Sequence, residues 1–146
     1  MIKNCHICIN LIGVLYETKK QQFKIIHSDF PDMLSKIANK SKIEKLIHLS
    51  SLGIEQATDS KYALSKLEGE QRLKKIFKNY VILTPSSVYS VDDNFTTNFM
   101  TLLSRLPVFP LYYGGNTKFA PIHCSDLTDT IHHVILNNIY SKIIEC

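Results

Sequence analysis

The sequence Tyr62-Ala63-Leu64-Ser65-Lys66, together with the preceding pair Ser50-Ser51, decides how this chain folds and what its side chains can do. The segment is predicted to be helical, and residues four positions apart on a helix share a face, so Tyr62 and Lys66 are neighbours. Ser50 and Ser51 follow an apolar segment and so lie at the carboxyl end of a predicted strand, where open α/β sheets place ligands. Such side chains are typical of a centre that reduces a carbonyl or oxidises an alcohol.

The chemistry of such a centre follows from its functional groups. A free phenol has a pKa of about 10 and is a sluggish acid or base at neutral pH. An ammonium held beside a phenol stabilises the phenolate and brings the phenol into the range where acid–base catalysis is effective. A serine hydroxyl can hydrogen-bond the substrate carbonyl, but the hydride has to come from a nicotinamide because no side chain supplies one.

The spacing of tyrosine and lysine is not specific by itself, because a chain this rich in both residues contains roughly one such pair by chance. Tyr16 and Lys20 have the same spacing, but they lie in a polar connection with no serine at a strand end before them. We interpret that pair as a chance match. Tyr62 differs from Tyr16 because a predicted strand and two serines precede it.

The rest of the chain alternates between predicted strands and predicted helices. Strands are predicted at 5–12, 43–49, 80–84 and 139–146, and helices at 23–39, 61–78, 95–106 and 125–137. Pro31 should kink the first helix or start a new one, and Ser125 or Asp126 should cap the last. A turn is predicted at Gly114-Gly115-Asn116, between 111–113 and 118–122. The alternation indicates βαβ units and a parallel sheet in one α/β domain.

The four cysteines are interpreted as buried thiols. Cys5-His6-Ile7-Cys8 has the spacing of half a zinc site or of a redox-active pair. The segment is predicted to be a strand buried on both faces, where residues three apart point to opposite sides. No second Cys-x-x-Cys or histidine pair with zinc-site spacing offers further ligands, since His123 and Cys124 are adjacent in the sequence and Cys146 stands alone, so we predict no metal site.

The net charge of +4 is spread along the sequence. The basic residues of 36–45 and 74–78 fall where predicted helices expose polar faces, which favours solvated surface over a nucleic-acid or anionic-lipid site. No apolar run approaches the roughly 20 residues that cross a bilayer, and the N-terminus lacks the pattern of a signal peptide. We therefore expect a cytoplasmic protein with no transmembrane segment and no nucleic-acid partner.

Four motifs follow one another along the chain: Ser50-Ser51, Tyr62 to Glu70, Val81 to Tyr89, and Pro121 to Asp126. In this order they resemble the motifs of the extended and atypical short-chain dehydrogenase/reductases, the NAD-dependent epimerase/dehydratase family. Within this family the chain is most similar to the branch that includes the Rossmann-fold accessory subunit of respiratory complex I. Further segments that fit this branch are Asn10 to Gly13, the predicted helix with His27, and Tyr112 to Asp126.

The resemblance implies a role for each candidate residue. Tyr62 would be the catalytic acid or base, and Lys66 would favour the phenolate and hold the nicotinamide ribose. The other contacts would be Ser51 or Ser50 at the carbonyl, Pro85 and Ser86 at the nicotinamide, and Asn10 and Gly13 near the cofactor's ribose or adenine side. The cofactor would be NAD or NADP.

The sequence lacks one feature that this family uses to bind its cofactor. In Rossmann folds the pyrophosphate lies on a helix N-terminus after a glycine-rich turn. The five glycines of this chain contain no such arrangement, and the strand predicted at 5–12 resembles the family's fourth, with one edge left unpaired. The resemblance therefore predicts a partial Rossmann-like parallel sheet with flanking helices and without its N-terminal βαβ units. It would be one truncated NAD(P)-binding domain over 1–146, with a small substrate-side subregion around 90–125.

Three functional hypotheses follow. The chain is an NAD(P)-dependent reductase or epimerase for a small carbonyl or nucleotide-sugar substrate, a nucleotide-binding subunit of a respiratory complex, or a truncated remnant without activity. The absent phosphate-binding turn argues against independent catalysis and favours the second and third hypotheses. A partner polypeptide would supply the N-terminal half, or a respiratory complex would hold the chain. The protein would then be cytoplasmic or peripheral to a respiratory membrane.

Overall fold

The computed structural model describes residues 5–91, 94–105, 114, 116 and 118–146, without the side chains of residues 94–96, 98 and 99. A parallel sheet in the order β1-β2-β3-β6 consists of β1 (Ile7–Asn10), β2 (Lys45–Leu49), β3 (Tyr80–Thr84) and β6 (Lys142–Glu145). Two short strands, β4 (Val88–Tyr89) and β5 (Ile122–His123), pair separately. The helices are η1 (Lys24–Asp29), α1 (Phe30–Lys40), α2 (Lys61–Ile76), α3 (Asn94–Arg105) and α4 (Cys124–Leu136). The predicted α/β class with a parallel sheet is confirmed.

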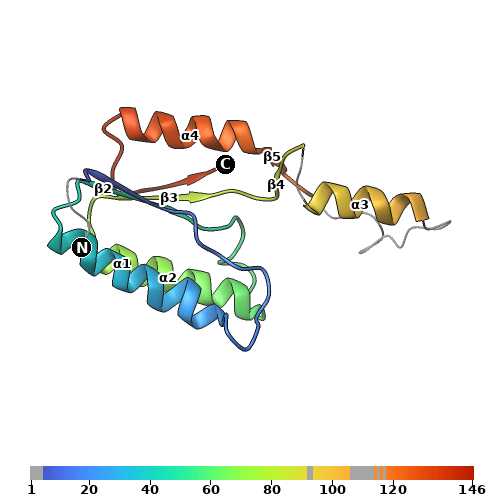
Figure 1. Ribbon diagram of the computed structural model, residues 1–146, viewed down its shortest axis with the longest axis horizontal. Helices are drawn as coiled ribbons and strands as arrows, with labels where there is room; N and C mark the ends of the chain where they lie inside the picture. The colour runs from blue at the N-terminus through green and yellow to red at the C-terminus, as the bar shows by residue number, and fades with distance from the viewer. Residues whose placement is uncertain (1–4, 92–93, 106–113, 115, 117) are drawn as a thin grey trace.

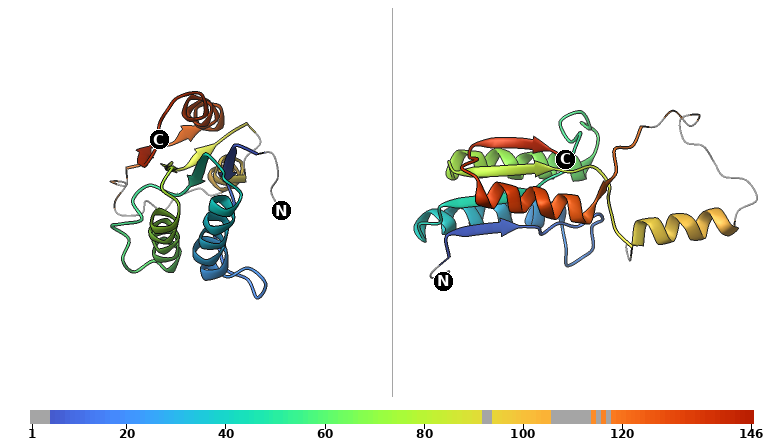
Figure 2. Two further views of the ribbon diagram at one scale, coloured as in Figure 1. Left: turned by 90° about the vertical axis from the view of Figure 1, so that its left-hand side faces the viewer. Right: turned by 90° about the horizontal axis from the view of Figure 1, so that it is seen from above.

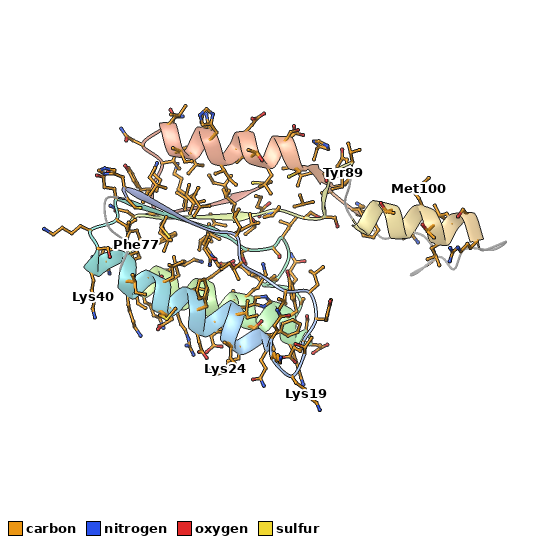
Figure 3. The ribbon with its side chains drawn as sticks, viewed as in Figure 1. Lys19, Lys24, Lys40, Phe77, Tyr89 and Met100 are labelled. Carbon is orange, nitrogen blue, oxygen red and sulfur yellow. The ribbon has the colours of Figure 1, made fainter. Side chains whose placement is uncertain are left out.

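The sheet lies between two helical layers, with α1 and α2 on one face and α4 on the other (Figure 1). The end-on view of Figure 2 shows α1 and α2 side by side beneath the strands. The buried core between the sheet and the helices α1 and α2 consists of Ala38, Ile43, Leu46, Leu73, Phe77 and Ile82, of which Phe77 is labelled in Figure 3. The buried core between the sheet and α4 consists of Ile47, Val81, Leu83, Leu127 and Val134. Burying each large apolar side chain contributes roughly 1.5–3 kcal/mol, so both layers stabilise the sheet.

Local chemistry sets the bounds of α2, the helix with Tyr62 and Lys66. Ser60 is its N-cap, and the Ser60 Oγ accepts a hydrogen bond from the N–H of Ala63 at 3.3 Å. Two lysines occupy the last turn, where positive charge interacts favourably with the helix dipole. The helix ends at Ile76, two residues before its predicted end.

The helix predicted at 23–39 consists of two segments. The π-helical η1 comes first, and α1 follows with Pro31 in its first turn, where the missing N–H of proline costs no helical hydrogen bond. Pro31 is predicted to kink the helix or to start a new one, and it lies in the first turn of α1, directly after the junction with η1. Within η1, His27 and Ser28 are buried, and the backbone of His27 lies close to Gly69 of α2.

The strand predicted at 5–12 is shorter and more exposed than expected. Among the described residues β1 pairs only with β2, so it lies at the edge of the sheet with the unpaired side that the sequence predicts. Ile9 is 41% exposed, and Leu11 and Ile12 beyond the strand end are 57% and 54% exposed. The expectation of a strand buried on both faces is wrong, because a strand with a neighbour on one side only is poorly covered.

The expectation of buried thiols is also wrong. Cys5 and Cys124 are exposed, and Cys8 and Cys146 are half-buried. Cys5 precedes the edge strand β1 and Cys124 begins α4, so both lie at the ends of elements rather than within the core. In the described part of the chain, no group of three or more His, Cys, Asp or Glu side chains could hold a metal ion.

Three smaller differences concern the second half of the chain. The ring of His123, rather than Ser125 or Asp126, caps α4 by accepting a hydrogen bond from the Ser125 N–H at 3.3 Å. The two-residue strand β4 was not predicted, because so short a strand has no periodicity. The predicted segment 111–113 and the centre of the Gly114-Gly115-Asn116 turn lie outside the described residues. Within the predicted 90–125 subregion, α3 projects away from the sheet (Figure 2), and the subregion itself stays a prediction.

Candidate active site

A cavity of about 500 Å³ lies at the carboxyl ends of β1, β2 and β3. It is lined by residues 11–15 after β1, 49–51 at the end of β2, 85–88 after β3, and Tyr62 and Lys66 of α2. The carboxyl ends of neighbouring parallel strands meet at one edge of a sheet, which is why segments so distant in sequence converge here. The paired serines and the helix with Tyr62 and Lys66 both contribute to the lining of this cavity.

Three of the predicted catalytic side chains lie together in the cavity. The Oγ of Ser51 and the hydroxyl oxygen of Tyr62 share a hydrogen bond of 2.8 Å. The Nζ of Lys66 lies 5.4 Å from the centre of the Tyr62 ring. A hydroxyl pair of this kind beside an ammonium can hydrogen-bond a carbonyl oxygen and exchange a proton with it.

Lys66 supplies positive charge at the site. It is 8% exposed, and burial lowers its pKa to about 8, a shift that the Glu70 carboxylate partly opposes, so the ammonium persists at neutral pH. Burial, followed by the charge of Lys66, lowers the pKa of His27 to about 4 and that of His48 to about 3. At neutral pH both histidines are therefore neutral while Lys66 is charged.

Ser50 and the connection after β3 complete the cavity wall. Ser50 is 3% exposed, and its Oγ has no hydrogen-bond partner among the described residues. A buried hydroxyl left without a partner costs free energy, which a ligand or a water molecule can recover. Pro85 and Ser86 line the same cavity, so the residues predicted to contact the nicotinamide lie beside the predicted proton-transfer residues.

The two residues predicted near the ribose or adenine side lie in different environments. Gly13 lines the cavity, and a Cβ added to it would lie 3.7 Å from His27 Nε2 and 3.9 Å from Lys66 Nζ. Asn10 is 2% exposed and lies outside the cavity lining. Its Nδ2 donates a hydrogen bond to His48 Nδ1 at 2.9 Å, and its Oδ1 accepts one from the backbone N–H two residues further on at 3.1 Å. Asn10 thus shapes the turn that leaves β1.

His27 is a site residue to which the sequence patterns gave no role. Its Nε2 accepts a hydrogen bond from the Val14 N–H at 3.1 Å, and its Nδ1 lies 3.0 Å from Ser65 Oγ. Its ring stacks on Phe23 and meets the Tyr62 ring edge-on, with ring centres 5.3 Å apart in each pair. In the sequence, the hint of this role is that His27 lies next to the apolar positions of its predicted helix.

Comparison with known proteins finds relatives of this chain, although no protein-family model matches it. The mitochondrial NADH dehydrogenase (ubiquinone) 1 alpha subcomplex subunit 9 of Dictyostelium discoideum is 30% identical over 135 residues, which are 92% of this chain and 37% of that protein. The same subunit of Mus musculus is 26% identical over 130 residues, 89% of this chain and 34% of that protein. The chain thus spans about a third of the length of these relatives.

Solved structures show the fold. A dTDP-4-dehydrorhamnose reductase from Clostridium acetobutylicum superposes with a TM-score of 0.79 at 18% identity, over 97% of this chain and 55% of its own. The same enzyme from Bacillus anthracis, in complex with NADP, gives 0.71 at 17% identity, over 97% and 55% of the two chains. A UDP-glucuronic acid 4-epimerase from Bacillus cereus, in complex with NAD, superposes with a TM-score of 0.72 at 18% identity, over 98% of this chain and 54% of its own.

Sequence and fold agree on one assignment. The relatives are mitochondrial NADH dehydrogenase subunits by name, and the structural neighbours are reductases and epimerases solved with NAD or NADP. None of the helices in the described ranges has both the length and the apolarity to cross a bilayer. By sequence the chain is a relative of subunit 9 of the NADH dehydrogenase alpha subcomplex, and by fold it matches reductases and epimerases solved with NAD or NADP, in agreement with its resemblance to the extended and atypical short-chain dehydrogenase/reductases.

Proposed function

We propose that the cavity binds the nicotinamide end of NAD or NADP and that this chain contributes the proton-transfer residues of a short-chain dehydrogenase/reductase. The observation that supports the proposal is the 2.8 Å hydrogen bond between Ser51 Oγ and the Tyr62 hydroxyl, with Lys66 beside the tyrosine ring. The substrate would be a small carbonyl compound or a nucleotide sugar, whose oxygen reaches both hydroxyls.

The residues present fit the nicotinamide end of such a cofactor. A bound nicotinamide supplies or accepts the hydride. The buried Ser50 Oγ, which has no partner among the described residues, offers a hydrogen bond at the cavity, and Gly13 leaves room beside Lys66. Tyr62 would exchange the proton, and Ser51 would hydrogen-bond the carbonyl oxygen. Lys66 would hold the nicotinamide ribose while its charge stays beside the phenol.

The pyrophosphate end of the cofactor has no counterpart in this sequence, because its five glycines form no glycine-rich turn before a helix. The edge of β1 that no described strand pairs with offers a place where another polypeptide can add such a unit by strand pairing. We therefore propose that this chain works with a partner polypeptide that supplies a glycine-rich βαβ unit and extends the sheet at β1. On its own it would not catalyse the reaction.

A second candidate function rests on the named relatives, which are subunits of NADH dehydrogenase. In this setting the chain would be held in a respiratory complex at the membrane surface, and the nucleotide would stabilise the fold without being turned over. The two candidates differ in one observable property, which is whether a bound nicotinamide is oxidised or reduced when a carbonyl or alcohol is supplied.

Cofactor binding tests the proposed division between this chain and a partner. Calorimetry should detect no binding of NADH or NADPH to the chain alone, because the pyrophosphate lacks its cradle. Adding a polypeptide with a glycine-rich βαβ unit, taken from a relative, should restore binding with one cofactor per pair of chains. Tight stoichiometric binding by the chain alone would refute the need for a partner.

Replacement of Tyr62 by phenylalanine tests the proton-transfer role in the reconstituted pair. Tyr62→Phe should lower turnover of a carbonyl substrate by roughly 10²-fold or more, the usual contribution of a general acid, and leave cofactor affinity near that of the unmodified pair. The matched control is Tyr16→Phe, which removes an exposed hydroxyl from a tyrosine with the same spacing to a lysine. Turnover that survives Tyr62→Phe would assign Tyr62 to structure. Cofactor binding without any turnover would favour the second candidate.

A further inference from the structure

His27 joins two parts of the cavity that are distant in the sequence. Val14 belongs to the loop 11–15, which follows β1 and forms one wall of the cavity. Ser65 lies on α2, between Tyr62 and Lys66. Because His27 hydrogen-bonds both Val14 and Ser65, its ring bridges the loop and the helix.

The hydrogen bonds determine where the proton of His27 lies. Nε2 accepts a bond from a backbone N–H and so carries no proton; the neutral ring then has its proton on Nδ1 and donates it to Ser65 Oγ. Ser65 Oγ in turn donates to the backbone carbonyl oxygen of Tyr62 at 2.7 Å. A continuous series of three hydrogen bonds therefore runs from the loop to the backbone of the candidate catalytic tyrosine.

Packing holds the ring of His27 in this orientation. Phe23 stacks on it at an interplanar angle of 16°, and Phe23 also meets Tyr62 edge-on, with ring centres 5.7 Å apart. The neighbouring Ser28 donates from its Oγ to the Ser65 carbonyl oxygen at 2.9 Å. The π-helical geometry of η1 places two successive residues against the same helix, and π-helical turns are frequent at functional sites.

We propose that His27 is a positioning residue whose neutral ring fastens the loop 11–15 to α2 and so fixes the cavity wall relative to Tyr62 and Lys66. It acts through its hydrogen bonds to Val14 and Ser65, and it meets the ring of Tyr62 edge-on. The proposal concerns the chain without a ligand. Its test is therefore independent of whether the chain binds a nicotinamide.

NMR of the ¹⁵N-labelled chain near neutral pH tests the proposal. The ¹⁵N shifts of the His27 ring should show the neutral tautomer with the proton on Nδ1. His27→Phe keeps an aromatic ring and removes both hydrogen bonds, so hydrogen exchange of the Val14 amide should accelerate by roughly tenfold or more. His27→Gln, whose side-chain oxygen can accept the Val14 bond, should restore much of the protection. Ser28→Ala is the matched control, because it removes a bond from η1 to α2 that does not involve the loop.

A pH titration of the unmodified chain follows exchange of the Val14 amide, which would not depend on protonation of His27 if this residue only packed against its neighbours. Val14 should lose its protection with the same midpoint as the His27 ring, while amides of β2 and β3 stay protected. The titratable groups around His27 are Lys66 and Tyr62 on α2 and His48 on β2, so His48 is followed in the same spectra. A ring protonated on Nε2 at neutral pH, or unchanged Val14 exchange in His27→Phe, would overturn the proposal. If His27→Phe does not fold, the ¹⁵N shifts of the His27 ring and the pH dependence of Val14 exchange in the unmodified chain test the proposal.

Discussion

Replacement of Gly69 by alanine should destabilise the fold, because η1 and α2 cross with their backbones in close contact at this glycine. A Cβ at Gly69 would overlap the carbonyl oxygen of His27 and lie 3.0 Å from its carbonyl carbon and 3.5 Å from Ser28 Cα. These are backbone atoms, so no side-chain rotation relieves the overlap. The only relief is a shift of η1 away from α2 by on the order of 1 Å.

The size of the effect follows from two opposing contributions. Overpacking a well-filled site costs typically 1–3 kcal/mol, and an overlap with rigid backbone belongs at the upper end of that range. Alanine in a helix interior regains about 1 kcal/mol of intrinsic propensity over glycine. The net loss in the free energy of unfolding is therefore about 2 kcal/mol, or roughly 4–8 °C in melting temperature for a chain of this size.

Urea unfolding followed by circular dichroism measures this loss, and Gly13→Ala is the matched control. The methyl group added at Gly13 would also lie near His27, but at 3.7 Å from Nε2, an ordinary van der Waals contact. Gly13→Ala should therefore be neutral or slightly stabilising. If Gly69→Ala and Gly13→Ala unfold at the same urea concentration, the close crossing of η1 and α2 does not exist in solution.

Two further predictions concern buried ionisable groups. Lys45→Met should lower the free energy of unfolding by about 1–3 kcal/mol, because the buried Lys45 Nζ donates to two backbone carbonyls at the end of α4, and urea unfolding measures the loss. The contribution of His27 and His48 to stability should be full above about pH 6.5 and fall as the pH is lowered. In the unfolded chain, His27 and His48 take up protons near pH 6.5, whereas in the folded chain their pKa values are about 4 and about 3. A urea midpoint that does not change between about pH 7 and pH 5 would contradict this.

The positions of Tyr62, Lys66 and Ser51 in the cavity could be predicted from the sequence because their geometry is local. Tyr62 and Lys66 are brought to one face by the period of a single helix, and Ser51 is placed by the end of a single strand. Neither position depends on how the helices and strands cross in space. The contact of 2.8 Å between Ser51 and Tyr62 does depend on tertiary structure, but an α/β sheet allows few other arrangements of a strand end and the next helix.

What the sequence did not predict depends on neighbours in space. The partners of His27 lie 13 and 38 residues away, and they meet it because η1 is π-helical and because Gly69 admits its backbone. The exposure of β1 has the same origin. The apolar pattern of a central strand is the same as that of an edge strand. The sequence therefore predicts burial for the strand at 5–12, whereas Ile9 is exposed.

The open edge of the sheet and the wall of the cavity belong to one continuous segment. Pairing along β1 would fix the backbone up to Asn10, whose side chain already holds the next turn through the N–H of Ile12. Two residues further on, His27 holds Val14 from the side of α2. A strand added at β1 would thus order this segment from one end while His27 orders it from the other. A partner and a ligand that both favour the same loop conformation must each raise the affinity for the other, because such coupling is reciprocal.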